Sequence, residues 1–282
     1  MTVGKIAFMI CTTPLPHTPT INRSQVEFYR REGYLLREDA ILPSDDFRDL
    51  CSTFEVLQAE WIAMGGRPEA MNVPHFYHTE MMRWLMHPAI LDLVEPIIGP
   101  DILLYSSHFI CKPAGDGQRI PWHEDAAYWR KQWSPMDVVT VWLALDDSDT
   151  DNGCMNVVPR THLSPDSDYS ELSERAVFTL EIKTGTFDAS KAVPCIRRAG
   201  QASLHHGKTI HGSAPNTSSR RRCGFTMCAS AACRYFQEHG ENGTFQVYQA
   251  RGRNLAGSPL ADPTKINKLW IDRFGYGPPK IY

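Results

Sequence analysis

The stretch ILLYSSHFICK at residues 102–112 decides the fold, because the chain changes its pattern there. From this point on, β-favouring residues follow one another in short runs with a period of two, and clusters of Gly, Pro, Asp and Asn separate the runs. The strands expected after Ile102–Lys112 are Val138–Leu145, Met155–Val158, Glu181–Lys183, Ala202–His205 and Phe225–Ser230. The turn Asp151-Asn152-Gly153 is expected to join two of them as a hairpin.

The residues before this stretch are mainly helical in pattern. Ser24 and Glu27 form an expected capping box, and Gly33 ends the short helix that follows. Apolar side chains then recur every three or four residues over 44–65, and a further helix is expected at Pro88–Ile98. Helices first and short strands afterwards predict an α+β fold with an all-β core. The core is expected to be a double-stranded β-helix (a cupin-like jelly roll) with the N-terminal helices packed on one sheet.

Length and composition limit the function classes. A chain of 282 residues that is 42% hydrophobic can bury a large core, and we expect one domain over residues 22–282 after an N-terminal extension, 1–21. A net charge of −3 gives no basic surface for nucleic acid. No apolar run is long enough for a membrane span, and the end Lys280-Ile281-Tyr282 is not a peroxisomal address. We therefore expect a cytoplasmic protein.

Two histidines and one aspartate give the first chemical indication. His123 and Asp125 stand two residues apart, so at a strand end they share one face, and His211 follows 88 residues later. This is the ligand set of the facial triad that holds non-haem Fe(II) and leaves open positions. Arg222 lies eleven residues beyond His211, and its planar guanidinium suits the carboxylate of a co-substrate. His205 and His206 lie close by in sequence but are not favoured as iron ligands.

Several segments, in order along the chain, resemble the phytanoyl-CoA dioxygenase family. The similarity covers roughly 24–230 and begins with SQVEFYRREGY at residues 24–34. The other matching segments are Lys112-Pro113, Trp122-His123-Glu124-Asp125, Tyr128-Trp129, Val141-Trp142, 152–155, 158–162, His211-Gly212-Ser213, 215–218 and Arg222. Agreement over so many ordered segments is far more specific than the triad alone.

The resemblance implies a jelly-roll oxygenase that uses Fe(II), 2-oxoglutarate and O2. By position, the implied iron ligands are His123, Asp125 and His211. Arg222 and Ser213 match the pair that holds the distal carboxylate of oxoglutarate, and Trp142 and His108 match further contacts with it. Halogenases of this kind carry a small residue where Asp125 stands, so the resemblance implies oxygenation rather than halogenation.

The expected reaction is hydroxylation, desaturation or another oxidation of a small, mostly apolar molecule, in natural-product biosynthesis. The segment Asn72–Met82 is rich in aromatic, Met and His residues and is expected to form part of a lid. Partners other than this substrate are not expected, although a homodimer is left open.

Three other functions are weighed against this one. The first is a fatty acyl-CoA hydroxylase of the phytanoyl-CoA type. The second is a cupin-type metal isomerase or hydrolase without 2-oxoglutarate, against which Arg222 and the sequence around His211 speak. The third is a non-catalytic binding protein, which the intact triad disfavours.

Overall fold

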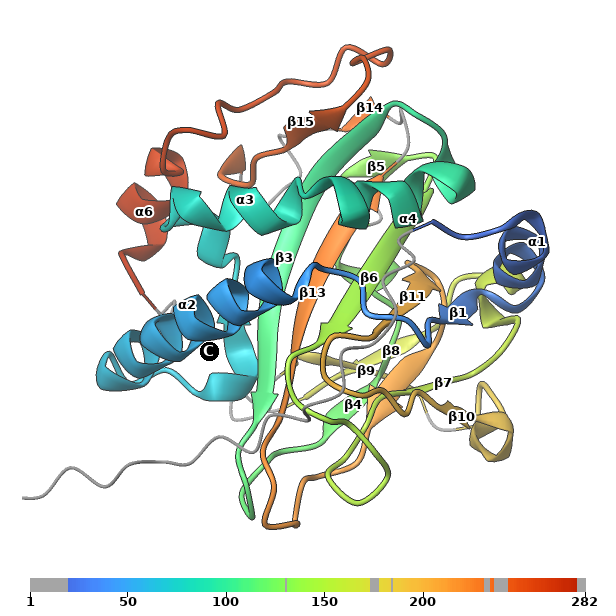
Figure 1. The fold of residues 1–282 in the computed structure, drawn as a ribbon. Coiled ribbons are helices and arrows are strands. Elements are labelled where there is room, and N and C mark those ends of the chain that lie inside the picture. Colours follow the sequence, from blue (N-terminus) through green and yellow to red (C-terminus); the bar gives the residue numbers. More distant parts are fainter. Residues whose placement is uncertain are drawn as a thin grey trace, which may run out of the picture.

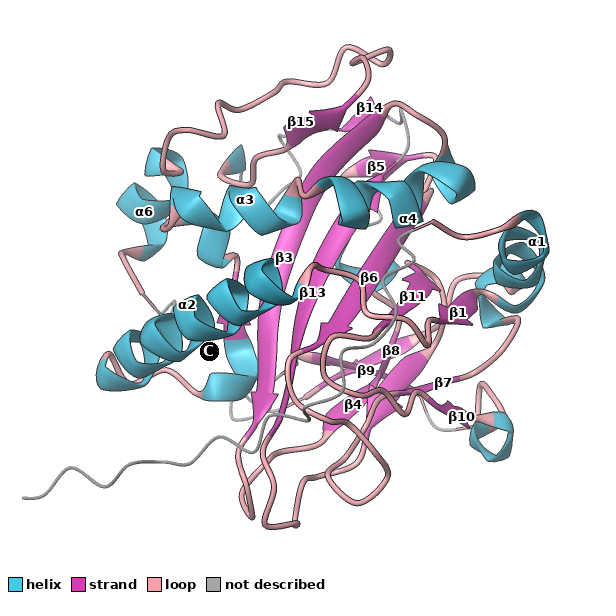
Figure 2. Cartoon of the chain, viewed as in Figure 1, coloured by secondary structure: helices cyan, strands magenta, loops and turns pink. Residues whose placement is uncertain are grey.

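The computed structural model describes residues 20–129, 131–172, 178–183, 185–230, 234–235 and 243–277. In these residues, two antiparallel sheets form the centre of the molecule, and helices cover the outer face of the larger one (Figure 1, Figure 2). The expected α+β jelly roll with helices packed on one sheet is confirmed. No helix of the described residues combines the length and the apolar character that crossing a bilayer requires.

The larger sheet contains residues 102–112, the stretch at which the sequence pattern changes from helical to β. Its order is β1 (Tyr34–Leu36), β11 (Ala202–His206), β6 (Val138–Ala144), β13 (Arg222–Ser230), β3 (Ile102–Lys112) and β15 (Tyr248–Arg251), and β2 (Met71–Asn72) pairs with β3 beside this path. Every residue of β6 is buried, because helices lie on one side of it and the second sheet on the other. The residues of β6 that face inward nevertheless include the polar Thr140, whose side chain lines the cavity between the sheets.

The smaller sheet has the order β10 (Val193–Pro194), β7 (Asn156–Val157), β12 (His211–Ser213) and β4 (Ile120–His123). Two separate strand pairs are β8 (Tyr169–Glu171) with β9 (Leu180–Ile182) and β5 (Trp133–Ser134) with β14 (Arg234–Tyr235). The pairing of β12 with β4 places His211 directly opposite His123 in the register. Two residues far apart in the sequence thus become neighbours.

The helices are α1 (Arg23–Glu32), α2 (Ser44–Ala63), α3 (Met82–Leu85), α4 (Pro88–Ile98), α5 (Ala126–Trp129) and α6 (Lys268–Phe274). The short 3-10 turns are η1 (Pro68–Ala70), η2 (Pro74–Phe76), η3 (Thr79–Met81), η4 (Thr161–Leu163) and η5 (Ala189–Lys191). Helix α4 has the predicted bounds, since Pro88 opens it and Gly99 follows its end with φ +89°.

Aromatic side chains join the helices to the larger sheet. Phe109 of β3 stacks on Phe225 of β13 with 4.4 Å between ring centroids. The ring centroid of Phe54 in α2 lies 4.8 Å from that of Phe109. All three side chains are almost fully buried. The outer face of the sheet is therefore core, and its inner face is left to line a cavity.

Two local predictions are wrong. The capping box of α1 is formed by Asn22 and Gln25, not by Ser24 and Glu27, because the Asn22 side chain accepts from the Gln25 N–H at 3.0 Å and the Gln25 side chain accepts from the Asn22 N–H at 2.9 Å. The turn at residues 151–153 does not close a hairpin. It carries the chain from β6 of the larger sheet to β7 of the smaller one.

Candidate metal centre and co-substrate site

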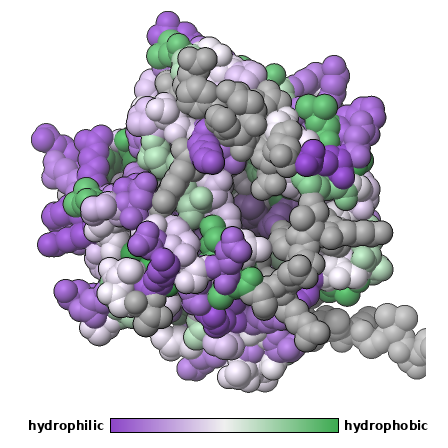
Figure 3. Space-filling model, turned by 180° about the vertical axis from the view of Figure 1, so that it is seen from behind, coloured by the Kyte–Doolittle hydropathy of each residue, from purple (hydrophilic) through white to green (hydrophobic). Residues whose placement is uncertain are grey.

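A cavity of about 240 Å³ lies at the inner faces of the two sheets, lined by residues of β3, β6, β11 and β13 of one sheet and β4 and β12 of the other. Figure 3 shows the molecule from behind, where the surface is hollowed near its centre. Polar side chains from the strands line one part of the cavity, and aromatic side chains line another.

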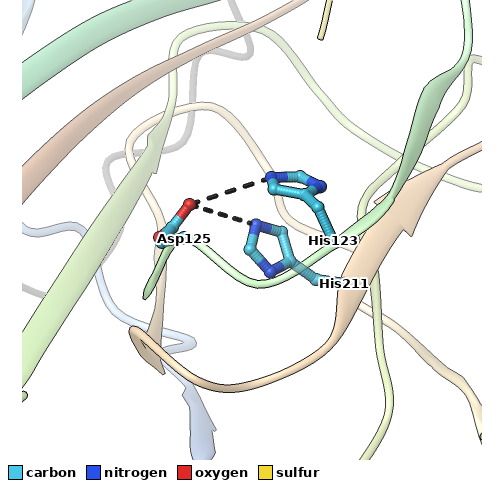
Figure 4. A group of neighbouring side chains, drawn as sticks. All are labelled: His123, Asp125 and His211. Atoms are coloured by element: carbon cyan, nitrogen blue, oxygen red, sulfur yellow. Dashed lines mark ion pairs between the residues drawn. The ribbon is translucent and has the colours of Figure 1, made fainter. Parts of the chain in front are cut away.

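The three residues of the predicted triad meet in this cavity. One ligand atom each from His123, Asp125 and His211 lies within 4.8 Å of the other two. The Nε2 atoms of His123 and His211 are 3.8 and 3.6 Å from the same carboxylate oxygen, Oδ1 of Asp125 (Figure 4). His123 ends β4, Asp125 follows it before α5, and His211 begins β12.

Hydrogen bonds fix how the two imidazoles are turned. Nδ1 of His123 donates to the carbonyl of Pro121 at 2.8 Å, and Nδ1 of His211 donates to the carbonyl of Thr209 at 2.9 Å. A carbonyl can only accept, so each neutral ring presents a free Nε2 lone pair to the cavity. Burial lowers the pKa of both histidines, which favours this neutral form. Such an arrangement fits a divalent metal ion.

The carboxylate of Asp125 is charged. Burial alone would raise its pKa, but the hydrogen bond from the neighbouring His205 helps to hold the pKa below the usual range. Its second oxygen, Oδ2, accepts from the Thr140 hydroxyl at 2.7 Å and from Nε2 of His205 at 3.2 Å. His205 therefore contacts the triad through Asp125 and is outside the cluster of ligand atoms.

Glu124, between the two triad residues of the motif, is fully buried but has another role. Its carboxylate accepts from Ser167 and from the hydroxyl of Tyr169, both at 2.8 Å. These bonds attach β8 and the residues before it to the metal motif. Nothing in the sequence had indicated this connection.

Arg222 and Ser213 also meet in the cavity, as expected. The Arg222 guanidinium donates to the carbonyl of Gly153 from Nε and Nη2 at 3.1 and 2.8 Å, and Nη2 lies 3.2 Å from Oγ of Ser213. Trp142 covers the guanidinium, with Cζ 5.6 Å from the ring centroid. In the described part of the chain, no carboxylate pairs with Arg222, although its side chain is buried. A buried cation without a protein counter-ion fits an anionic ligand.

Lys112 lies beside Arg222 on the neighbouring strand. It is the register partner of Arg222, is fully buried, and donates to the carbonyl oxygens of Ser213 and Ala214. Burial, and then the charge of Arg222, lower the pKa of Lys112 to about 6. The lysine thus supports the backbone that carries Ser213.

His108 lines the same cavity, but both of its ring nitrogens have protein partners. Nδ1 lies 3.0 Å from the side-chain oxygen of Asn72, and Nε2 lies 2.8 Å from Oγ of Ser106. Burial lowers the pKa of His108 to about 4, so the ring is neutral. Any contact with oxoglutarate would be through the face of the ring.

Aromatic side chains line the other part of the cavity. Tyr128 and Trp129 belong to a segment that the sequence had indicated, whereas Phe178, Phe245 and Trp270 had not been singled out. The expected lid at residues 72–82 packs mainly into the core instead, since its central residues, including His75 and Phe76, are fully buried. Only Asn72 and Val73 of that segment line the cavity.

Comparisons with known proteins agree with this geometry. The chain is 26% identical over 233 residues to L-proline trans-4-hydroxylase of Streptomyces griseoviridis, covering 69% of this chain and 81% of that protein. It is 32% identical over 249 residues to the peroxisomal phytanoyl-CoA dioxygenase of Bos taurus, covering 78% and 72%. The structure of the non-heme monooxygenase ThoJ without ligand matches with a TM-score of 0.68 at 27% identity, covering 86% and 89%.

Fold and site together define a non-haem iron oxygenase of the class that uses 2-oxoglutarate and O2. The family model described as phytanoyl-CoA dioxygenase (PhyH) matches residues 29–224, so the chain belongs to this family. The predicted family, enzyme class and cofactors are confirmed. The cupin-type isomerase or hydrolase and the non-catalytic binding protein are thereby set aside.

Proposed function

We propose that His123, Asp125 and His211 hold the Fe(II) and that Arg222 and Ser213 bind the distal carboxylate of 2-oxoglutarate. The observation that carries the proposal is the convergence of two bare Nε2 atoms on one oxygen of a charged carboxylate. Two histidines and one carboxylate leave open positions on the metal for other ligands. We propose that residues 22–282 act as one domain.

Bound there, Fe(II) and oxoglutarate supply the oxidation, since reduction of O2 is coupled to conversion of oxoglutarate to succinate and CO2. The side chains of the protein position the metal and the co-substrate and supply the charge that binds them. Arg222 fixes one end of the co-substrate through its guanidinium, and Trp142 keeps water away from that contact. Backbone carbonyls hold both imidazoles at fixed angles, so the triad is organised before the metal binds.

We propose a small, neutral and mostly apolar substrate that is hydroxylated, desaturated or otherwise oxidised, in natural-product biosynthesis. Among the described lining residues, Arg222 is the only Lys or Arg, and the only carboxylates are Asp125 and Glu69. Glu69 already pairs with Arg67, and the other two are assigned to co-substrate and metal. No lining charge is left for an amino-acid substrate such as the proline named for one relative.

The alternative is an acyl-CoA substrate, which the name of the bovine relative suggests. Its acyl chain would also fit an aromatic cavity, but its phosphates would need cations outside it. Succinate release with a panel of neutral ring compounds, free amino acids and acyl-CoA thioesters separates the candidates. Turnover with acyl-CoA alone overturns the proposed substrate class and leaves the metal site intact.

The metal assignment has its own experiment. His123→Ala, Asp125→Ala and His211→Ala should each abolish stoichiometric Fe(II) binding and turnover. His78→Ala is the matched control, because His78 begins a similar pattern, His-x-Glu, but contacts Glu80 and Tyr276 and does not line the cavity. Full iron content and normal turnover in His211→Ala would falsify the assignment.

A further inference from the structure

Two side chains of the larger sheet hold the oxygen of Asp125 that faces away from the histidines. The Thr140 hydroxyl donates to Oδ2 at 2.7 Å, and Nε2 of His205 lies 3.2 Å from the same atom. A carboxylate oxygen only accepts, so both groups donate. Oδ1, in contrast, is the oxygen nearest to His123 and His211.

The register of the sheet places these two donors together. Thr140 of β6 pairs directly with His205 of β11, so their side chains project from one face toward the same atom. Both side chains are about 2% exposed, and both line the cavity. Nδ1 of His205 is buried without a hydrogen-bond partner in the described structure. The ring thus has one polar contact, and that contact is with Asp125.

We propose that Thr140 and His205 are positioning residues that hold Asp125 so that it binds the metal through Oδ1 alone. The inference rests on the proposed metal site. A carboxylate can bind a metal through one oxygen or through both, and binding through both would occupy a position that co-substrate or O2 requires. Two donors on Oδ2 satisfy that oxygen within the protein and leave Oδ1 as the ligand atom.

The polar Thr140 and His205 stand at buried positions of the sheet that apolar side chains could have filled, and their common partner is Asp125. Trp142 and Ser203 are the next pair on the same face of β6 and β11, and Oγ of Ser203 is buried without a partner among the described residues. Ser203 therefore offers a matched control on the same strand and face as His205. Removing its hydroxyl breaks no hydrogen bond.

The test is anaerobic titration of the full chain with Co(II), which absorbs visible light when bound. His205→Phe and Thr140→Val should each weaken Co(II) binding by about 10- to 100-fold, the usual effect of removing a partner of a metal ligand. His205→Gln and Thr140→Ser, which can keep a donor, should recover most of the affinity, and Ser203→Ala should bind as the wild type does. The double variant should show less than the product of the single effects, because both donors act on one atom.

The spectrum of bound Co(II) gives a readout that a loss of packing would not produce. If Asp125 becomes free to bind through both oxygens, the coordination number rises and the visible bands lose intensity in His205→Phe and Thr140→Val. Wild-type affinity and spectrum in both variants overturn the inference. So does an equal loss of affinity in Ser203→Ala. If Asp125→Ala also binds Co(II) normally, the proposed metal site itself is wrong, which distinguishes the two failures.

Discussion

Nη2 of Arg222 lies 3.2 Å from Oγ of Ser213, and the two residues stand on strands of different sheets. The contact therefore bridges the two layers of the jelly roll beside the cavity. A guanidinium and a hydroxyl at this spacing can donate to the two oxygens of one carboxylate.

The first prediction concerns this pair. Arg222→Ala should weaken oxoglutarate binding by about 2 to 5 kcal/mol, the usual cost of removing one side of a buried charged pair. Metal binding should remain, because Arg222 is not among the clustered ligand atoms. Calorimetric titration under nitrogen measures both effects, first of the metal-free protein with metal and then of the metal-loaded protein with oxoglutarate.

Arg220 and Arg221 are the controls for this prediction. Arg220 pairs with Asp149, and Arg221 pairs with Asp146 and Glu55, all apart from the cavity lining. Their alanine variants should bind oxoglutarate as the wild type does. A larger loss in either control than in Arg222→Ala means that the wrong arginine has been assigned.

The second prediction concerns the space that Trp142 occupies. A Cβ atom on Gly224 would overlap the indole of Trp142, while the backbone at Gly224 is not in the left-handed region. Gly224→Ala should displace the indole from Arg222, weaken oxoglutarate binding and cost about 1 to 3 kcal/mol of stability, as overpacked cores do. Urea unfolding and the oxoglutarate titration measure the two effects.

Gly207→Ala is the control, since its Cβ would meet Val138 at an ordinary contact distance of 3.5 Å. It should change neither stability nor oxoglutarate binding by a comparable amount. Wild-type behaviour of Gly224→Ala would show that Trp142 can move without loss.

The third prediction concerns acid stability. Burial, and then the nearby His108, lower the pKa of His75 to about 3, and its usual value is about 6.5. Because the unfolded chain takes up a proton there that the folded chain does not, this residue stabilises the fold above pH 6.5, and that contribution is lost as the pH falls toward 3. Between pH 7.5 and 5 the loss should be about 2 kcal/mol for this residue.

His75→Asn removes the titrating group and can keep the hydrogen bond to Oγ of Ser107. The variant should be less stable at pH 7.5 but should lose about 2 kcal/mol less than the wild type on going to pH 5. Urea unfolding of the metal-free protein at both pH values gives the comparison. An unchanged pH dependence contradicts the assignment of this proton to His75.

The fourth prediction concerns chloride. Asp125→Gly should open space for the anion, and Thr140 and His205 would face it as donors. Efficient chlorination is not expected, because the substrate hydrogen must also lie nearer to chloride than to the oxygen that is transferred. Wild-type product formed in chloride buffer should contain no chlorine, and a chlorine isotope pattern in its mass spectrum would contradict oxygenation.

The sequence predicted best what depends on local chemistry. The bounds of α4 and β3 were predicted correctly, because Pro, Gly and a regular apolar period mark them directly. The triad could be named because its motif and the surrounding segments match a family pattern. The pairing of His211 with His123 could not be predicted, because the register between distant strands depends on the whole sheet.

Most of the site residues that the sequence did not predict are brought together only by the fold. Thr140 is a polar residue in the otherwise apolar run VVTVWLA, and that pattern was a usable signal of a polar cavity wall. The sequence presents its partner His205 only as an alternative ligand, because it does not tell which strand lies opposite. Phe178, Phe245 and Trp270 come from segments far apart in the chain, and only the fold brings them together.

Different kinds of structure supply the two parts of the cavity. The metal and co-substrate residues belong to strands or strand ends, whereas Tyr128 and Trp270 belong to helices and Phe178 and Phe245 to connecting segments. Loops and short helices accept substitution and length change more readily than paired strands do. Tyr128 and Phe178 can therefore be varied to seek new substrates while the oxidising centre is inherited unchanged, whereas Phe245 and Trp270 also belong to the hydrophobic core.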